Sequence, residues 1–302
     1  MTGQIPVLFG IVLAATLLHT AGCYRPVEPP VLVDLPSAAP SKPQYFTVGW
    51  SVEGRPIKCL VLGDGDDVTL ILAAIHGDEP AGVPLVRALA AHLAENPQLL
   101  HDRRVVLLPV ANPDGLLYDS RTNAHAVDLN RDFPASNRPS NSPPNREPES
   151  RVIAQLIRQY RVDRIVSIHQ LTDTGPQALV NRVPHGCIDY DGPAKKLAEH
   201  IARYCNLSVE RLGPAPGSLG SHAGLDLHIP CITMELPLAA EMLGAETLWQ
   251  RYGRALLAAV LYPEDLPASP AEKPRSYIGN DLRRNLPART NLEYVDKPGP
   301  EP

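Results

Sequence analysis

Apolar runs alternate with segments of helical periodicity over the first half of the chain. Residues 68–75 and 105–110 are almost continuously apolar, which predicts strands buried on both faces. Residues 82–95 and 148–160 repeat apolar positions every three or four residues, which predicts helices. Upstream, residues 44–62 contain two short strand-like stretches, 44–52 and 55–62, with Glu53-Gly54 as the hairpin turn between them.

The second half of the chain continues this alternation. Together with the first half, it predicts an α/β fold with a single mostly parallel, mixed central sheet and helices on both faces. Residues 112–145 lack a regular period but are rich in polar side chains, as loops that carry binding residues commonly are. The further strands are residues 164–168 and 231–236, and the further helices are residues 193–204 and 239–261.

Metal-binding residue types follow two of the predicted strands. His76 and Glu79 come after residues 68–75, and His169 comes after residues 164–168. Ligands of open α/β sheets bind beyond the carboxyl ends of the strands, so we expect these side chains to converge. Two imidazoles and one carboxylate are a ligand set of hydrolytic zinc sites, which keep one position for water. The three residues together predict one Zn²⁺ ion.

The order of these and later motifs resembles the zinc carboxypeptidase family, which includes pancreatic carboxypeptidases and bacterial murein peptide amidases. The resemblance covers residues 68–262 and is closest to the murein peptide amidase branch. It implies the fold predicted above and a zinc-dependent hydrolase. The motifs that carry it are His76-Gly77-Asp78-Glu79, Asn112-Pro113-Asp114-Gly115, the run 121–134 that contains Asp128-Leu129-Asn130-Arg131, Glu147-Pro148-Glu149-Ser150, Pro216-Gly217-Ser218-Leu219-Gly220-Ser221, and Glu235 inside a late apolar run.

The resemblance also assigns catalytic roles. It makes His76, Glu79 and His169 the zinc ligands, and zinc lowers the pKa of a coordinated water toward about 7. Glu235 becomes the general base that passes a proton from water to the leaving amine, a role worth about 10²–10⁴-fold in rate. The alternative for Glu235 is a structural salt bridge, because an unpaired carboxylate is expensive to bury.

Three further residues are expected to handle substrate. By the same resemblance, Arg121 polarises the scissile carbonyl and stabilises the oxyanion. Asn130 and Arg131 hold a substrate carboxylate, which a guanidinium fork matches with two hydrogen bonds. The alternatives are an ordinary surface role for Arg121 and pairing of Arg131 with Asp128 or Asp132.

The chain departs from the family pattern at several positions. Residues 212–219 hold no tyrosine, unlike digestive carboxypeptidases, which shifts the expected substrate class. Ala126, after His125, stands where the branch has glycine, and alanine disfavours the positive φ that glycine allows. Gln170 is atypical and is a candidate for substrate contact. His222 lies past the Pro-Gly-Ser segment, where we expect a surface helix.

Composition narrows the class of protein. The chain has 302 residues, 44% of them hydrophobic, enough for a substantial core. The net charge is −5 with mixed signs and no basic patch, which excludes nucleic acid as a partner. Four cysteines lie in the folded region, and they allow three disulfide pairings or free thiols. These are Cys59, Cys187, Cys205 and Cys231.

The N-terminus reads as a targeting segment. Residues 5–18 are almost wholly apolar but shorter than the ~20 residues of a membrane span. Thr20-Ala21-Gly22-Cys23 resembles a bacterial lipoprotein cleavage box with Cys23 as the lipidated residue. An uncleaved N-terminal anchor or a plain signal peptide is the alternative. Each of these predicts an exported protein of the bacterial cell envelope, periplasmic or on the outer surface.

These features divide the chain into four expected segments. Residues 1–23 are the signal or lipoprotein segment, and residues 24–43 are a proline-rich linker. Residues 44–262 form the zinc peptidase domain, and residues 263–302 are a disordered, proline-rich tail. The oligomeric state stays open.

The leading functional hypothesis is a zinc metallopeptidase that hydrolyses an amide bond in peptidoglycan-derived peptides, such as the bond from γ-D-glutamate to diaminopimelate. The alternatives within enzymes are a general carboxypeptidase and an amidohydrolase of the succinylglutamate desuccinylase or aspartoacylase type. A different class is a non-catalytic protein that binds cell-wall peptide. The presence of all three ligands together with Glu235 argues against that class.

Overall fold

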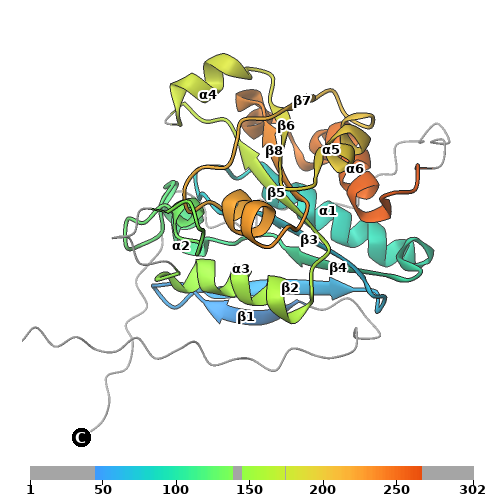
Figure 1. Ribbon diagram of the computed structural model, residues 1–302, viewed down its shortest axis with the longest axis horizontal. Helices are drawn as coiled ribbons and strands as arrows, with labels where there is room; N and C mark the ends of the chain where they lie inside the picture. Colours follow the sequence, from blue (N-terminus) through green and yellow to red (C-terminus); the bar gives the residue numbers. More distant parts are fainter. Residues whose placement is uncertain (1–44, 139–144, 174, 267–302) are drawn as a thin grey trace, which may run out of the picture. The chain divides into compact units, whose positions relative to one another are not determined.

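Eight strands form one mixed sheet in the computed structural model of the chain, in the order β1-β2-β4-β3-β5-β8-β6-β7 (Figure 1). The structure describes residues 45–138, 145–173 and 175–266, all within one unit, Leu32–Pro302. The central strands β4, β3, β5 and β8 run parallel, and β2 and β6 pair antiparallel on either side. The bounds are β1 Phe46–Trp50, β2 Pro56–Leu62, β3 Asp67–Ala73, β4 Arg103–Leu108, β5 Arg164–Gln170, β6 Cys187–Asp191, β7 Ser208–Glu210 and β8 Cys231–Leu236.

Helices cover both faces of this sheet (Figure 1). One core contains side chains of α1, α5 and α6, and the other contains side chains of α3 and η3. Successive residues of the central strands alternate between the two cores, which explains their continuous apolar runs. The helices are α1 Gly82–Glu95, η1 Pro97–Leu100, α2 Pro113–Tyr118, η2 Leu129–Arg131, α3 Pro148–Gln159, α4 Gln177–Arg182, α5 Lys195–Ala202, η3 Gly220–Asp226, η4 Leu238–Met242 and α6 Ala245–Leu261.

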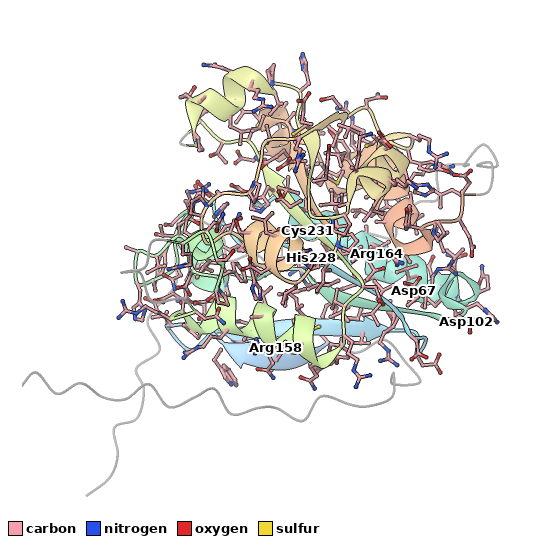
Figure 2. All side chains as sticks on the ribbon, in the orientation of Figure 1. Asp67, Asp102, Arg158, Arg164, His228 and Cys231 are labelled. Atoms are coloured by element: carbon pink, nitrogen blue, oxygen red, sulfur yellow. The ribbon has the colours of Figure 1, made fainter. Side chains whose placement is uncertain are left out.

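The two ends of the central strands have different chemistry. At the amino ends, Arg164 of β5 donates to Asp67 of β3 with an Nη2–Oδ1 distance of 2.5 Å (Figure 2). At the carboxyl ends, polar side chains gather around a cavity. The fold therefore places the candidate site where parallel α/β sheets usually bind ligands.

The predicted fold class is confirmed, with one element wrong. The single helix expected over residues 239–261 is two elements, η4 and α6, separated by an extended Leu243 and by Gly244. Each of the other predicted strands and helices is present, with ends that differ by at most two residues. The hairpin turn is also confirmed, since Gly54 has a φ of +74°.

Several short elements were not predicted. Residues 112–145, expected to be irregular, contain α2 and η2. Strands β6 and β7 and the π-helix η3 also lack a sequence signal of their own. Strand β6 has only five residues, and polar positions alternate with apolar ones in it because one of its faces lines the cavity.

The predicted targeting segment, linker and most of the tail lie outside the described residues. None of the helices within the described ranges combines the length and apolar character that a membrane crossing requires. Every cysteine in those ranges is a free thiol: Cys59, Cys187, Cys205 and Cys231.

Candidate metal and substrate site

The ends of β3 and β5 bring the three predicted metal ligands together. These strands are parallel neighbours with Ala73 opposite Ile168, so the residues that follow them meet at one edge. Ala74 takes a φ of +51° and turns the chain toward His76 and Glu79. The donor atoms of His76, Glu79 and His169 all lie within 4.8 Å of one another.

The cluster is buried and its charges are closely coupled. Glu79 Oε1 lies 2.7 Å from His76 Nδ1, and Glu79 Oε2 lies 2.8 Å from His169 Nδ1. Burial opposes ionisation of Glu79, but the two imidazoles outweigh it and hold the pKa of that carboxyl well below its usual range. Two ring nitrogens that face one ionised carboxylate form a donor set that fits Zn²⁺.

Asp128 and Arg121 extend this cluster. Asp128 contacts His76 Nε2 through Oδ1 at 3.0 Å, which leaves Nδ1 of that ring to face Glu79. Arg121 donates from Nε to Asp128 Oδ2 at 3.1 Å and from Nη1 to Glu79 Oε1 at 3.2 Å. Arg121 is therefore placed at the ligand cluster and not in an ordinary surface position.

Asp128 is a site residue that sequence reasoning missed. The sequence suggests Asp128 only as a partner for Arg131, although it lies in the motif Asp128-Leu129-Asn130-Arg131. A carboxylate that accepts from the second ring nitrogen of a ligand histidine fixes the orientation of that ring. The signal was an acidic residue two positions before a predicted substrate-binding asparagine.

Asn130 and Arg131 line the same cavity. Asn130 Oδ1 accepts from Leu219 N at 2.9 Å, so its amide also ties this loop to the start of η3. Arg131 donates to the Asn130 carbonyl at 2.6 Å and forms no ion pair with a described residue. Both expected alternative partners of Arg131 are already occupied, since Asp128 contacts His76 and Arg121 and Asp132 accepts from Ser150 Oγ at 2.5 Å.

The loop that carries Arg121 and Asp128 is held by a buried network. Asn123 donates to Glu147 at 2.7 Å and to Glu149 at 3.1 Å. Its Oδ1 accepts from the backbone N–H groups of residues 125 and 127 at 3.1 Å. Ala126, inside this turn, has a φ of +58° and so keeps the left-handed conformation that glycine favours.

Glu235 lies beside the cluster, opposite His169 in the β5–β8 register. It is 8% exposed, lines the cavity and forms no ion pair with a described residue, unlike the alternative of a structural salt bridge. Burial raises its pKa to about 7, although the imidazole of His169 acts against this. Its carboxyl group can therefore take up and release a proton near neutral pH.

The cavity has a volume of about 190 Å³ and contains the cluster, Glu235 and the substrate-handling candidates. Gln170 also lines it; its Oε1 accepts from Ala81 N at 3.0 Å, and its Nε2 has no hydrogen-bond partner within the ranges that the structure describes. The expectation of a surface position for His222 is wrong, because this residue is 7% exposed. Its Nδ1 lies 2.7 Å from the Pro134 carbonyl, and the side chain does not line the cavity.

Comparisons with known proteins agree with this geometry. A family model described as zinc carboxypeptidase matches residues 31–203. Murein peptide amidase A of Escherichia coli is 33% identical over 190 residues, which cover 56% of this chain and 70% of the relative. Carboxypeptidase SOL1 of Arabidopsis thaliana is 30% identical over 140 residues, 42% of this chain but only 28% of that protein.

The fold matches solved structures as well. The crystal structure of a murein-tripeptide amidase from Escherichia coli superposes with a TM-score of 0.54 and 27% identity. The match covers 76% of this chain and 95% of the other. These findings identify a hydrolase: the chain belongs to the zinc carboxypeptidase family.

Proposed function

We propose that the protein hydrolyses the amide bond between γ-D-glutamate and diaminopimelate in a peptide derived from peptidoglycan. The observation that carries the proposal is the presence of the His76–Glu79–His169 cluster, Glu235 and Arg131 on one cavity. Similarity to a murein peptide amidase over 70% of that enzyme supports the choice of bond. The branch-specific absence of a tyrosine in residues 212–219 also favours it over digestive carboxypeptidases.

The ligand cluster suits one zinc ion. His76, Glu79 and His169 would hold it, and zinc supplies a Lewis acid that polarises a carbonyl and acidifies water. Asp128 keeps the His76 ring in its orientation through the contact at Nε2. The protein groups thus fix the cluster before substrate arrives.

The other side chains of the cavity have separate roles in the reaction. Glu235 takes a proton from the water that attacks the carbonyl carbon and passes it to the amine nitrogen as the C–N bond breaks, because burial raises the pKa of Glu235 to near neutrality. Arg121 donates to the oxygen of the scissile carbonyl as negative charge develops there. Arg131 and Asn130 bind a carboxylate of the residue that is released.

We further propose that the enzyme works outside the cytoplasm, close to the cell wall. Support comes from the apolar run 5–18 and the sequence Thr20-Ala21-Gly22-Cys23, which resembles a lipoprotein box. Attachment through a lipid on Cys23, or through an uncleaved N-terminal anchor, would place the enzyme near its polymer. Mass spectrometry of membrane fractions tests this, since a lipidated protein begins at Cys23 and carries acyl chains.

The proposed reaction is tested by product analysis. Zinc-loaded protein is incubated with L-Ala-γ-D-Glu-meso-diaminopimelate and, separately, with an ordinary peptide that ends in an L-residue. We expect release of diaminopimelate that a chelator abolishes and added zinc restores. Cleavage of the ordinary peptide alone would assign a general carboxypeptidase, and zinc binding without cleavage of either would favour a binding protein.

A further inference from the structure

A second group of polar side chains lines the cavity away from the metal cluster. In the β5–β8–β6 register, Ser167 is opposite Thr233, and Thr233 is opposite Asp189. Residues directly opposite on paired strands point to the same face, so these three form one row across the sheet. Asp191 is two residues from Asp189 and shares that face. All four residues line the cavity that contains Glu235.

The hydrogen-bonding capacity of this row is largely unused within the protein. Asp189 and Asp191 are 5% and 6% exposed, and neither forms an ion pair with a described residue. Asp189 accepts from Leu212 N at 2.8 Å and also lies near the backbone N–H of Tyr190, whereas the Asp191 carboxylate accepts no hydrogen bond from the described part of the chain. Ser167 is 2% exposed, and its Oγ has no hydrogen-bond partner among the described residues.

Arg182 and Arg211 act to lower the pKa of Asp189, and Arg211 that of Asp191, but neither arginine forms an ion pair with these carboxylates. Arg211 is exposed and lies over the Tyr190 ring at 5.9 Å, on the residue of β6 that alternates away from Asp189 and Asp191. Burial, together with repulsion from Asp189, raises the pKa of Asp191 to about 6. The row therefore concentrates negative charge in a confined space, where a bound cation is favoured.

We infer that Ser167, Thr233, Asp189 and Asp191 form a subsite for a protonated amine on the side chain of the residue that the enzyme releases. An ammonium group has three donors and no acceptor, which matches a surface of carboxylate and hydroxyl oxygens. This inference rests on the proposed use of the cavity as the substrate site. In diaminopimelate, the amine at the far end of the side chain is the group that this subsite would read.

The shape above the row limits what can enter. A Cβ atom built on Gly220 of η3 would lie 1.9 Å from Asp191 Oδ2, so this helix packs directly against the carboxylate. An apolar side-chain end would leave two buried carboxylates unpaired, and an end that carries a carboxylate without an amine would be repelled by them. The subsite thus selects the end of the substrate side chain by its charge as well as by its size.

The test compares ligands that differ only in this amine. The first pair is L-Ala-γ-D-Glu-meso-diaminopimelate and the same peptide ending in 2-aminopimelate, compared by kcat/KM with zinc-loaded protein. The second pair is free lysine and norleucine, whose Kd values are measured by calorimetry and need no cleavage. Charge-assisted hydrogen bonds in a buried site predict a preference of about 10- to 100-fold for the amine in both pairs.

Matched variants show which residues cause the preference for ligands that carry the side-chain amine. In the double variant D189N/D191N, the ratio within each pair should fall toward 1, whereas Ser167→Ala should lower it only a few-fold. The control is Asp102→Asn, in an exposed turn before β4 at the other end of the sheet (Figure 2), which should keep the ratio of the native protein. A ratio that the double variant leaves unchanged would overturn the inference.

The outcomes separate the subsite from the proposed reaction. If the tripeptide is not cut but lysine binds at least 10-fold more tightly than norleucine, the proposed reaction fails and the subsite stands. If both tripeptides are cut at equal rates, the reaction stands and the subsite is wrong. If no tripeptide is cut and neither amino acid is preferred, both are wrong.

Discussion

The two ends of the cavity differ in how completely their polar groups are paired within the protein. At the metal-ligand end, Glu79, His76 and Asp128 are joined by contacts of 2.7–3.0 Å, and Arg121 bridges them. At the opposite end, the buried Ser167 Oγ and Asp191 carboxylate have no hydrogen-bond partner in the described part of the chain. The first end is organised by the fold before substrate binds, whereas the amine subsite inferred at the second end needs a ligand to complete it and lowers stability until then.

The largest effect at the paired end is expected from Arg121→Ala. Loss of an oxyanion donor should lower kcat about 10²–10³-fold, because the lost interaction forms only as charge develops on the carbonyl. Rates and zinc content are measured together on the proposed tripeptide. The control is Arg158→Ala, on the exposed side of α3 (Figure 2), which should retain native turnover. Loss of zinc along with activity would instead give Arg121 a structural role.

Asp128→Asn tests whether pairing organises the metal cluster. Removing the charge that orients His76 should weaken zinc binding about 10- to 100-fold. Competition with a chelator of known affinity measures this, with Asp102→Asn as the matched control. Unchanged zinc affinity would mean that His76 is held by packing alone.

Asp191→Asn tests the cost of the unpaired end. Because the folded-state pKa of Asp191, about 6, lies above the unfolded value of about 3.9, the folded protein binds this proton more tightly. The contribution to stability is therefore present at low pH and is lost as pH rises through 6. Asparagine stays neutral, so the variant should melt about 2–4 °C higher than the native protein at pH 8.

The gain in Tm from Asp191→Asn should shrink by pH 5, where the native carboxyl is itself mostly protonated. Thermal melts at both pH values, with a chelator present for both proteins, separate this effect from zinc binding. A variant that is less stable at pH 8 would show that Asp191 holds the fold together and does not await a ligand.

The smallest effect concerns the loop that carries Arg121 and Asp128. Ala126 pays a steric cost at its φ of +58°, so Ala126→Gly should raise the free energy of unfolding by about 0.5–1 kcal/mol. Urea unfolding measures the change. The control is Ala91→Gly inside α1, which should lower stability by about 1 kcal/mol because glycine weakens a helix.

The paired end of the cavity was largely predictable from the sequence. His76 and His169 follow apolar runs that are buried on both faces, and such runs mark parallel strands whose carboxyl ends meet. Glu79 lies three residues from His76, so its place in the cluster also has a local signal. Two pieces of information were enough to predict that the three metal-ligand candidates lie together. These are the order of strands and helices along the chain and the rule that parallel sheets bind ligands at the carboxyl ends of their strands.

The unpaired end could not be predicted in the same way. Asp189 and Asp191 acquire their positions from the antiparallel pairing of β6 with β8, which brings together residues about 40 positions apart. Asp128 likewise meets His76 across 52 residues of sequence. The five residues of β6 alternate in polarity and cannot be told from a loop by sequence alone. Only the pairing with β8 determines which of their side chains share a face.

The most direct test of the zinc-hydrolase account is Glu235→Gln. The account predicts one zinc ion per chain, as in the native protein, and tripeptide hydrolysis slower by about 10²–10⁴-fold, because the general base is lost while His76, Glu79 and His169 remain. Glu241→Gln, an exposed control after β8, should keep native activity. Near-native hydrolysis by the zinc-loaded Glu235→Gln variant would contradict the account.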